Sequence, residues 1–415
     1  MLPSTRSLSR LAALMLAIGA MSGCKDFLHV ENPGPIEDSK LESADAVPAF
    51  VTGMSGDLSN SLDEIVRISG IASDELGHGG SYAGEQLWVR GVINYEDIND
   101  QWSGMQRARW VAEQGIERIK KLPNYNYDTD LQAARANMFA GFANRLLGEN
   151  VCETTIDAGP RQPNTIHFPR AEGYFTEALR IAQALPRNAS SVEVISASYA
   201  GRASMRAWQG KWTEAVADAA QVPDTFVFRA RYSTNSTREN NSLVQETYVR
   251  REFTVFGTQW AQVFNDPRVP WDTIYTSSAK TAVQKGQDGQ TNFFRQKKYP
   301  DLGADIPLVK GAEMRMLQAE AALRNHDITA AFGFINQQRA IYALPALAVP
   351  ATETAAWPIL EKERGAVVWL EARRLWDLRR WNAESGPQHN SFLDGRAKCI
   401  PISKNETLSN PNLGG

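Results

Sequence analysis

The residue types that most often carry catalysis are sparse in this chain of 415 residues. Its five histidines include no pair at the spacing of metal ligands, and it has no nucleophile-elbow, phosphate-loop or dinucleotide-binding motif. Asp74 and Glu75 are the most suggestive carboxylates, because glycoside hydrolysis uses two carboxyl groups that face each other. Adjacent loop residues point in different directions, so the sequence favours a protein that is not an enzyme and uses no metal or cofactor.

Two irregular regions instead hold the mixture of aromatic and polar side chains that suits saccharide binding. Aromatic rings stack on the apolar faces of pyranose rings, while carboxylates, amides and guanidinium groups bind sugar hydroxyls. The candidate ligand contacts are Asp74, Glu75, Tyr82 and Trp88 in the first region, and Trp260, Arg268, Trp271 and Tyr275 in the second. Aromatic residues on loops have less core packing to explain them than those on helices. For Trp88 and Trp260 the alternative role, as a cap on a helical layer, stays open.

The beginning of the chain has the pattern of an export signal. Two arginines precede the apolar run Leu11–Met21, which is too short to span a membrane and is followed by Ser22-Gly23-Cys24. Small residues directly before a cysteine resemble the cleavage site of bacterial lipoproteins. The pattern therefore predicts a signal peptide over residues 1–23, a lipid anchor on Cys24 and a mature protein outside the cytoplasm.

Export also bears on the other two cysteines. Cys152 and Cys399 form an even pair in a compartment where disulfides persist. Both lie at the ends of regular patterns, where loops can bring two Cα atoms close enough for a bridge. We therefore expect a Cys152–Cys399 disulfide that holds the C-terminal tail against the first helical unit.

Composition sets wider limits on the class of protein. With 43% hydrophobic and 22% charged residues, the chain has an ordinary globular composition and enough apolar residues for a large core. A formal net charge of −3, with no basic cluster, gives no sign of nucleic-acid binding.

Helical periodicity dominates the elements that must position these residues. Ile306–Leu347 contains two helical patterns joined by a polar turn, each with apolar residues at i, i+3 and i+4. Small residues twelve positions apart, Ala319 and Ala331, would let the two helices approach closely, and Ala203 and Ala215 repeat this interval. Such pairs are typical of tetratricopeptide-like units, which bury their faces by stacking. The predicted units are 131–185, 191–223 and 306–347, followed by a C-terminal helix over 352–381.

A long stretch between these units does not follow the helical pattern. Residues 223–305 contain short strand-like runs, at 226–228 and 248–256, among turns and loops. A stretch of this length inside a compact domain is expected to fold as a functional insertion. We therefore predict a mainly α fold in one domain, residues 24–415. It consists of tetratricopeptide-like helical repeats, an insertion-rich subdomain at 223–305 and a few short strands.

Several motifs follow one another along the chain. The mature start has Cys24, Lys25-Asp26, Phe27-Leu28 and Asn32-Pro33. An alanine-glutamate helix, Ala312–Ala321, precedes Ile335–Arg339. The C-terminal region carries Glu363-Arg364, Glu371-Ala372-Arg373-Arg374, Asp377-Leu378-Arg379-Arg380-Trp381, Ile400-Pro401 and Asn410-Pro411-Asn412. Together these motifs resemble the SusD/RagB family of outer-membrane nutrient-binding lipoproteins.

The resemblance implies a function that the residues alone do not identify. It implies a non-catalytic lipoprotein, anchored in the outer membrane and facing the cell exterior, that passes an oligosaccharide or similar nutrient to a SusC-like TonB-dependent transporter. It implies no nucleic-acid partner, and contact with the membrane only through the lipid anchor. Two alternatives stay open: a helical-repeat scaffold that binds only proteins, and a glycan-processing hydrolase that uses Asp74 or Glu75.

Overall fold

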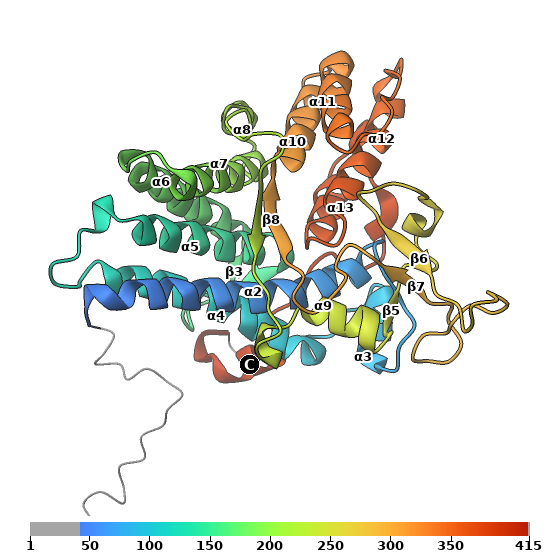
Figure 1. Cartoon of the computed structure of the whole chain (residues 1–415), viewed down its shortest axis with the longest axis horizontal. Helices are drawn as coiled ribbons and strands as arrows, with labels where there is room; N and C mark the ends of the chain where they lie inside the picture. The colour runs from blue at the N-terminus through green and yellow to red at the C-terminus, as the bar shows by residue number, and fades with distance from the viewer. Residues whose placement is uncertain (1–41, 414–415) are drawn as a thin grey trace, which may run out of the picture. The chain divides into compact units, whose positions relative to one another are not determined.

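The structure is a computed structural model that describes residues 42–413. The predicted signal sequence, Cys24 and the segment after it lie outside these residues. Contacts divide the chain into two units, Met1–Ala46 and Val47–Gly415. The described part of the first unit contains one short 3-10 helix, Ala44–Ala46. The second unit is mainly helical, as predicted, with a few short strands (Figure 1).

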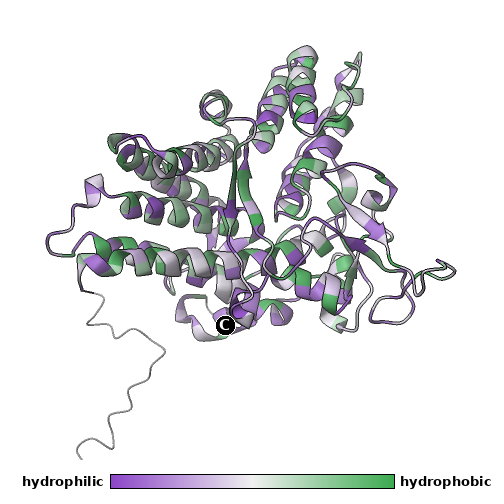
Figure 2. Ribbon diagram, viewed as in Figure 1, coloured by the Kyte–Doolittle hydropathy of each residue, from purple (hydrophilic) through white to green (hydrophobic). Residues whose placement is uncertain are grey.

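The helices of the second unit are amphipathic, and hydrophobic positions recur along them between hydrophilic ones (Figure 2). Short turns join many of them into antiparallel pairs. Its main helices are α2 (Val47–Ala72), α3 (Ala83–Val89), α4 (Asn99–Ile119), α5 (Leu131–Asn150), α6 (His167–Ala184), α7 (Ala189–Trp208), α8 (Trp212–Ala219), α10 (Gly311–Arg324), α11 (Ile328–Ile341), α12 (Glu353–Val367), α13 (Arg374–Asn382) and α14 (Lys404–Ser409).

Two glycines allow close packing of α5, α6 and α7, which lie side by side (Figure 1). Phe175 of α6 is fully buried between Gly141 of α5 and Gly201 of α7. A Cβ atom at Gly141 or Gly201 would lie only 2.7 Å or 2.3 Å from the Phe175 ring. Phe142 meets the same ring edge-on, with 5.0 Å between the centroids. Packing, rather than backbone conformation, therefore requires glycine at these two helical positions.

The strands form four antiparallel pairs within residues 42–413. The pairs are β1 (Gly77–His78) with β5 (Phe253–Thr254), β2 (Glu153–Thr154) with β3 (Gln162–Pro163), β4 (Val227–Ala230) with β8 (Ile306–Lys310), and β6 (Trp271–Thr273) with β7 (Phe294–Gln296). Strand structure was predicted over 248–256, but residues Gln245–Val249 form a π-helix and only the short β5 follows. The β6–β7 pair and its long loop extend from the helical body (Figure 1).

The prediction that a helix begins at Ile306 is wrong. Residues 306–310 form β8, whose five residues are all buried and pair with β4. Pro307 has no N–H to donate within a helix, and the neighbouring strand supplies partners for the others. The helix begins at Gly311, where a Cβ atom would lie 2.1 Å from the Pro223 carbonyl oxygen. The boundary is therefore set by a segment distant in sequence.

The single C-terminal helix predicted over 352–381 is in fact two helices, α12 and α13, with a break between them. Leu370 and Ala372 in the break have φ angles of 54° and 58°, a left-handed conformation that non-glycine residues rarely adopt. Distant side chains hold this turn: the Leu370 N–H donates to Glu75 Oε1 at 2.7 Å, and its carbonyl accepts from the Tyr299 hydroxyl at 2.9 Å. The break turns Arg374 toward the loop that follows α2.

The predicted disulfide is confirmed. Cys152 and Cys399 are bonded, with 5.0 Å between their Cα atoms. Backbone hydrogen bonds lie directly beside the bridge, because the Cys152 N–H donates to the Ile400 carbonyl and the Ile400 N–H donates to Asn150, each at 2.8 Å. The C-terminal segment is therefore held against the end of α5.

Candidate functional site

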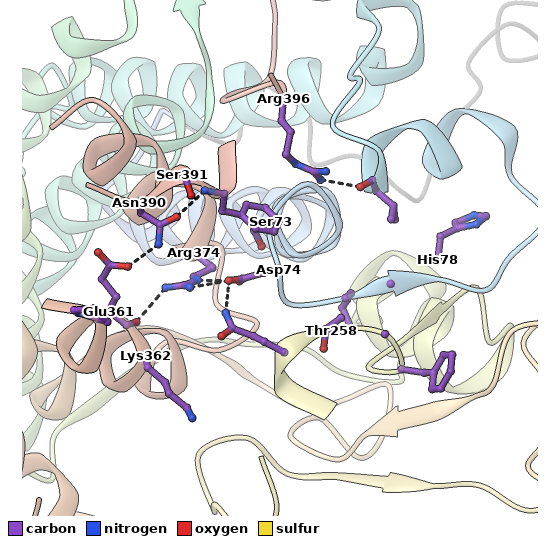
Figure 3. Close-up of a pocket in the computed structure, with 18 of the residues that line it drawn as sticks. Ser73, Asp74, His78, Thr258, Glu361, Lys362, Arg374, Asn390, Ser391 and Arg396 are labelled. Carbon is purple, nitrogen blue, oxygen red and sulfur yellow. Dashed lines mark hydrogen bonds and ion pairs between the residues drawn. The ribbon is translucent and has the colours of Figure 1, made fainter. Parts of the chain in front are cut away.

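A cavity of about 940 Å³ opens among several segments that are far apart in sequence, including α12 and the start of α13. The loop after α2 contributes Ser73, Asp74 and Leu76, with Gly77 and His78 of β1 beside them. The segment after β5 contributes Phe256–Gln259, and the segment after α13 contributes Pro387, His389–Phe392 and Arg396. Asp74 and Arg374 face each other at its centre, with Glu361 and Asn390 on one side and Thr258 and His78 on the other (Figure 3).

An ion pair between Asp74 and Arg374 fixes the centre of this cavity. Arg374 Nε and Nη2 donate to the two carboxylate oxygens of Asp74, at 2.8 Å and 2.7 Å. The Gln259 side chain also donates to Asp74, and Arg374 Nη1 donates to the Glu361 carbonyl oxygen at 3.1 Å. A bidentate guanidinium–carboxylate pair is among the most directional contacts in proteins. The cavity wall is therefore rigid at this point.

Glu361 places a second carboxyl group on the wall. Its side chain is largely buried on α12, and Oε2 accepts a 2.6 Å hydrogen bond from Asn390 Nδ2. Burial raises the pKa of Glu361 to about 7. Near neutral pH this carboxyl is therefore partly protonated and can either donate a hydrogen bond to a hydroxyl group or accept one.

The opposite wall is built on the β1–β5 pair. His78 on β1 is half-buried, and burial lowers the pKa of its imidazole, so the ring is neutral near pH 7. Phe256 follows β5 and its ring is 37% exposed at the edge of the cavity. This wall therefore offers an apolar face beside neutral polar groups.

A series of aromatic ring contacts continues from Phe256 along the strands. Phe256 meets Phe294 edge-on at 5.1 Å, Phe294 stacks on Trp271 at 5.0 Å with an interplanar angle of 8°, and Trp271 contacts Phe264 at 5.4 Å. Trp271 and Phe294 occupy diagonal positions on one face of the β6–β7 pair, which explains the stacking. Phe264 is 67% exposed and, with Trp271, lines a second hollow of about 540 Å³. We refer to Phe256, Phe294, Trp271 and Phe264 as the aromatic ladder.

Three predicted contacts belong to the protein core. Trp260 is fully buried, against Gly365 and 5.8 Å from the Arg374 guanidinium. Arg268 is also buried and donates to Asp266 and, at 2.6 Å, to Glu363. Glu75 is fully buried with its carboxyl turned toward Leu370, and burial raises its pKa to about 8. The expectation that these three side chains are exposed to a ligand is therefore wrong, because core packing and ion pairing use them.

The remaining predicted contacts are spread over separate surfaces. Tyr82 and Trp88 line a third hollow of about 490 Å³, but Trp88 is only 2% exposed, so its role as a cap on the helical layer is the one that the structure supports. Tyr82 is 37% exposed, with the Arg250 guanidinium 4.8 Å from its ring. Tyr275 is exposed on the β6–β7 extension, near Lys280. Only Asp74, of the eight, lies in the large cavity.

The sequence analysis missed the groups that the C-terminal region brings to the cavity. Asn390, Phe392 and Arg396 belong to an irregular polar segment with no motif, so no sequence signal identified them. Phe294 could have been found, because it alternates with buried Phe293 in a strand-like run.

Two structural findings concern metals and membranes. Within residues 42–413, no group of three or more histidine, cysteine, aspartate or glutamate side chains is arranged to hold a metal ion. No helix in that same range is long and apolar enough to cross a membrane.

Comparison with known proteins gives one family and one fold. The model of the SusD family matches residues 228–407, whereas no curated protein matches the sequence. A SusD-like carbohydrate-binding protein from Bacteroides vulgatus has a TM-score of 0.68 at 14% identity, over 90% of this chain and 97% of that chain. A SusD superfamily protein from the same species gives 0.66 at 13%, over 89% and 98%. B. fragilis NanU gives 0.65 at 13%, over 91% and 97%.

Proposed function

Because the chain is a SusD/RagB family protein with the SusD-like fold, we propose that it captures a nutrient glycan at the cell surface for import through a SusC-like TonB-dependent transporter. The large cavity at Asp74 and Arg374 is the observation that carries the proposal. At about 940 Å³ it lies in the size range of small-molecule sites, and its walls combine fixed polar groups with an apolar rim.

The chemistry of the walls fits sugar hydroxyls. Asp74 and Asn390 offer oxygen acceptors, Glu361 can donate or accept near neutral pH, and the exposed ring of Phe256 offers a face for stacking. The aromatic ladder extends this apolar face beyond the cavity, so an oligomer has more surface to contact than a single sugar. A SusD-like neighbour of the same fold is described as carbohydrate binding, which supports the same ligand class.

The arrangement of carboxyl groups favours binding over hydrolysis. A glycosidase needs one carboxylic acid and one free carboxylate on either side of the scissile bond. Glu361 has the raised pKa of an acid, but both oxygens of Asp74 are engaged by Arg374. An oxygen held in this way is a poor nucleophile or base. The SusD family is generally non-catalytic, in agreement with this argument.

The anchor and the transporter belong to the same proposal. Ser22-Gly23-Cys24 supports lipid attachment at Cys24, and the stacked helical pairs offer a rigid surface for docking on a membrane partner. Replacement of Cys24 by serine is expected to release the protein from membranes and to abolish labelling with palmitate. Undiminished labelling would contradict the anchor.

The ligand is best tested by screening protein that starts after Cys24 on a glycan array. Asn390→Ala and Trp271→Ala should then weaken binding of the strongest glycan by about 1–3 kcal/mol each, the range for loss of an aromatic or hydrogen-bond contact. Trp110→Ala is the matched control, because Trp110 is 51% exposed on α4 and lines neither the cavity nor the second hollow. Thermal melting of each variant would check the fold.

The outcomes separate the proposal from its alternatives. Binding of no saccharide by wild-type protein would favour the scaffold that binds only proteins. Release of reducing sugar from a bound glycan would favour the hydrolase. An equal effect of all three variants would show that the cavity and the ladder are not the binding face.

A further inference from the structure

The guanidinium of Arg396 lies on the cavity wall with no acidic partner. Its Nη2 donates to the Val89 carbonyl oxygen at 2.7 Å, and the group lies 4.8 Å from the Phe392 ring centroid (Figure 3). Among residues 42–413, no carboxylate lies within ion-pairing distance of it. Its Nε is buried without a hydrogen-bond partner, and burial lowers the pKa of the side chain. A partly buried guanidinium without a counter-charge is a suitable partner for an anionic group on a ligand.

The other charged groups of the cavity do not neutralise the positive charge of Arg396. The charge of Asp74 is engaged by Arg374, and the pKa of Glu361 is raised to about 7, so it carries only part of a charge near neutral pH. Lys362 is exposed at another part of the wall and, in the described part of the chain, makes no ion pair. His78 and His389 add no negative charge. The cavity is therefore electropositive, although the chain as a whole has a formal charge of −3.

An anionic substituent on the ligand would satisfy this arrangement. A guanidinium binds a carboxylate or a sulfate through two parallel hydrogen bonds, and a partly desolvated site strengthens the contact. We infer that the glycan taken by this cavity carries acidic groups, uronic carboxylates or sulfate esters, and that Arg396 binds one of them. The inference rests on the proposed function and specifies its ligand class.

The first test measures binding of the full-length protein, purified in non-ionic detergent, to three immobilised polysaccharides. Polygalacturonate presents carboxylates, κ-carrageenan presents sulfate esters, and galactan is neutral. Acidic polysaccharides are expected to bind more tightly, and their binding should weaken as sodium chloride is raised, because salt screens partly exposed charges. A preference for polygalacturonate or for κ-carrageenan identifies the acidic group. Equal or tighter binding of galactan overturns the inference but leaves the proposed function intact. Absence of binding to these three and to a glycan array overturns both.

The second test asks whether Arg396 is the residue that binds the acidic group. Arg396→Gln keeps the Cβ and Cγ atoms that pack on Gly91 and should weaken binding of the preferred acidic polysaccharide about tenfold or more, with little change for any neutral glycan. Arg396→Lys, which keeps the charge, should restore part of the affinity. Lys121→Gln is the matched control, since Lys121 is an exposed lysine that does not line the cavity.

Two results would refute the role of Arg396. One is unchanged affinity of Arg396→Gln for the acidic polysaccharide, and the other is an equal loss for acidic and neutral glycans. If Arg396→Gln does not fold, Lys362→Gln provides the second measurement, because this exposed side chain can change without loss of core packing. A smaller salt dependence in Lys362→Gln supports an electropositive cavity, and an unchanged salt dependence contradicts it.

Discussion

Removal of the disulfide should destabilise the protein strongly, and mainly through its C-terminal segment. The bridge joins residues separated by 247 positions, so it closes a loop that contains more than half of the chain. In the chain-entropy model, a loop of this length corresponds to about 5 kcal/mol of stability. For a protein of this size, an unfolding free energy lower by that amount corresponds to a fall in melting temperature of about 6 °C.

The structure also identifies which residues should loosen first. Beyond the bridge, the tail keeps a Thr155–Glu406 hydrogen bond at 2.8 Å and an Asn410–Gly159 hydrogen bond at 3.0 Å. Ile400 and Ile402 pack in the core, but the segment after them is held mainly by side-chain hydrogen bonds, in contrast to the close packing around Phe175. Reduced protein should therefore lose hydrogen-exchange protection in residues 403–413 before it loses protection in α5 and α6.

The assay compares wild-type protein with the double variant Cys152→Ala/Cys399→Ala by calorimetry and hydrogen exchange, each with and without reductant. Reductant should lower the wild-type melting temperature toward that of the double variant and leave the double variant unchanged. The reasoning would be refuted by a double variant that melts within about 1 °C of the oxidised wild type and retains tail protection. If the tail stays protected while the free energy of unfolding falls strongly, the disulfide acts mainly by restricting the unfolded chain.

Two further predictions follow from packing and from buried acids. Gly201→Ala should lower the free energy of unfolding by about 1–3 kcal/mol, because the added methyl group overlaps the Phe175 ring. The control Gly53→Ala places its methyl group in open space on α2 and should be neutral or stabilising by about 0.5–1 kcal/mol. Urea unfolding would measure both variants. Burial raises the pKa of Asp63 to about 8 and that of Glu75 likewise, so the native state holds protons that the unfolded carboxylates release. The free energy of unfolding should therefore fall from pH 7 to pH 8, where the unfolded His167 is mostly neutral and opposes the fall only weakly, and a flat or rising profile would contradict this.

Much of the helical frame could be predicted because its signals are local. Apolar residues at helical spacing and small residues at the close approaches identified α5 to α8, α10 and α11 without any knowledge of their partners. The elements for which the prediction was wrong depend on residues distant in sequence. β8 is a strand because β4 pairs with it, and the break after α12 exists because Glu75 and Tyr299 satisfy the backbone of Leu370. These partners lie outside the two segments, so the sequence pattern of each segment could not reveal them.

The candidate site was harder to predict for the same reason. Composition marked the loop at Asp74 and the strands near Trp271 as unusual, and both line hollows in the structure. Composition could not show that Trp260 and Arg268 turn inward, because this depends on Gly365 and Glu363 of α12. Nor could it show that Asn390 and Arg396, in a segment without periodicity, close the cavity. Which side chains are near each other in this region depends on the break in the C-terminal helices.

That break links the C-terminal charged motif, residues 363–381, to the wall of the proposed binding cavity. The charged residues of this motif are mostly buried, and several pair with one another or with α10. Arg364 pairs with Asp377 at 2.7 Å, and Arg380 pairs with Asp377 at 2.9 Å and with Glu320 of α10. These buried pairs fix α13 against α10 and α12, and the adjacent Arg374 extends the network to the cavity. Breaking one partner of a buried pair leaves an uncompensated charge, so the network resists partial rearrangement. A ligand that binds at this wall meets groups already held in position, and less of its binding energy is lost in ordering them.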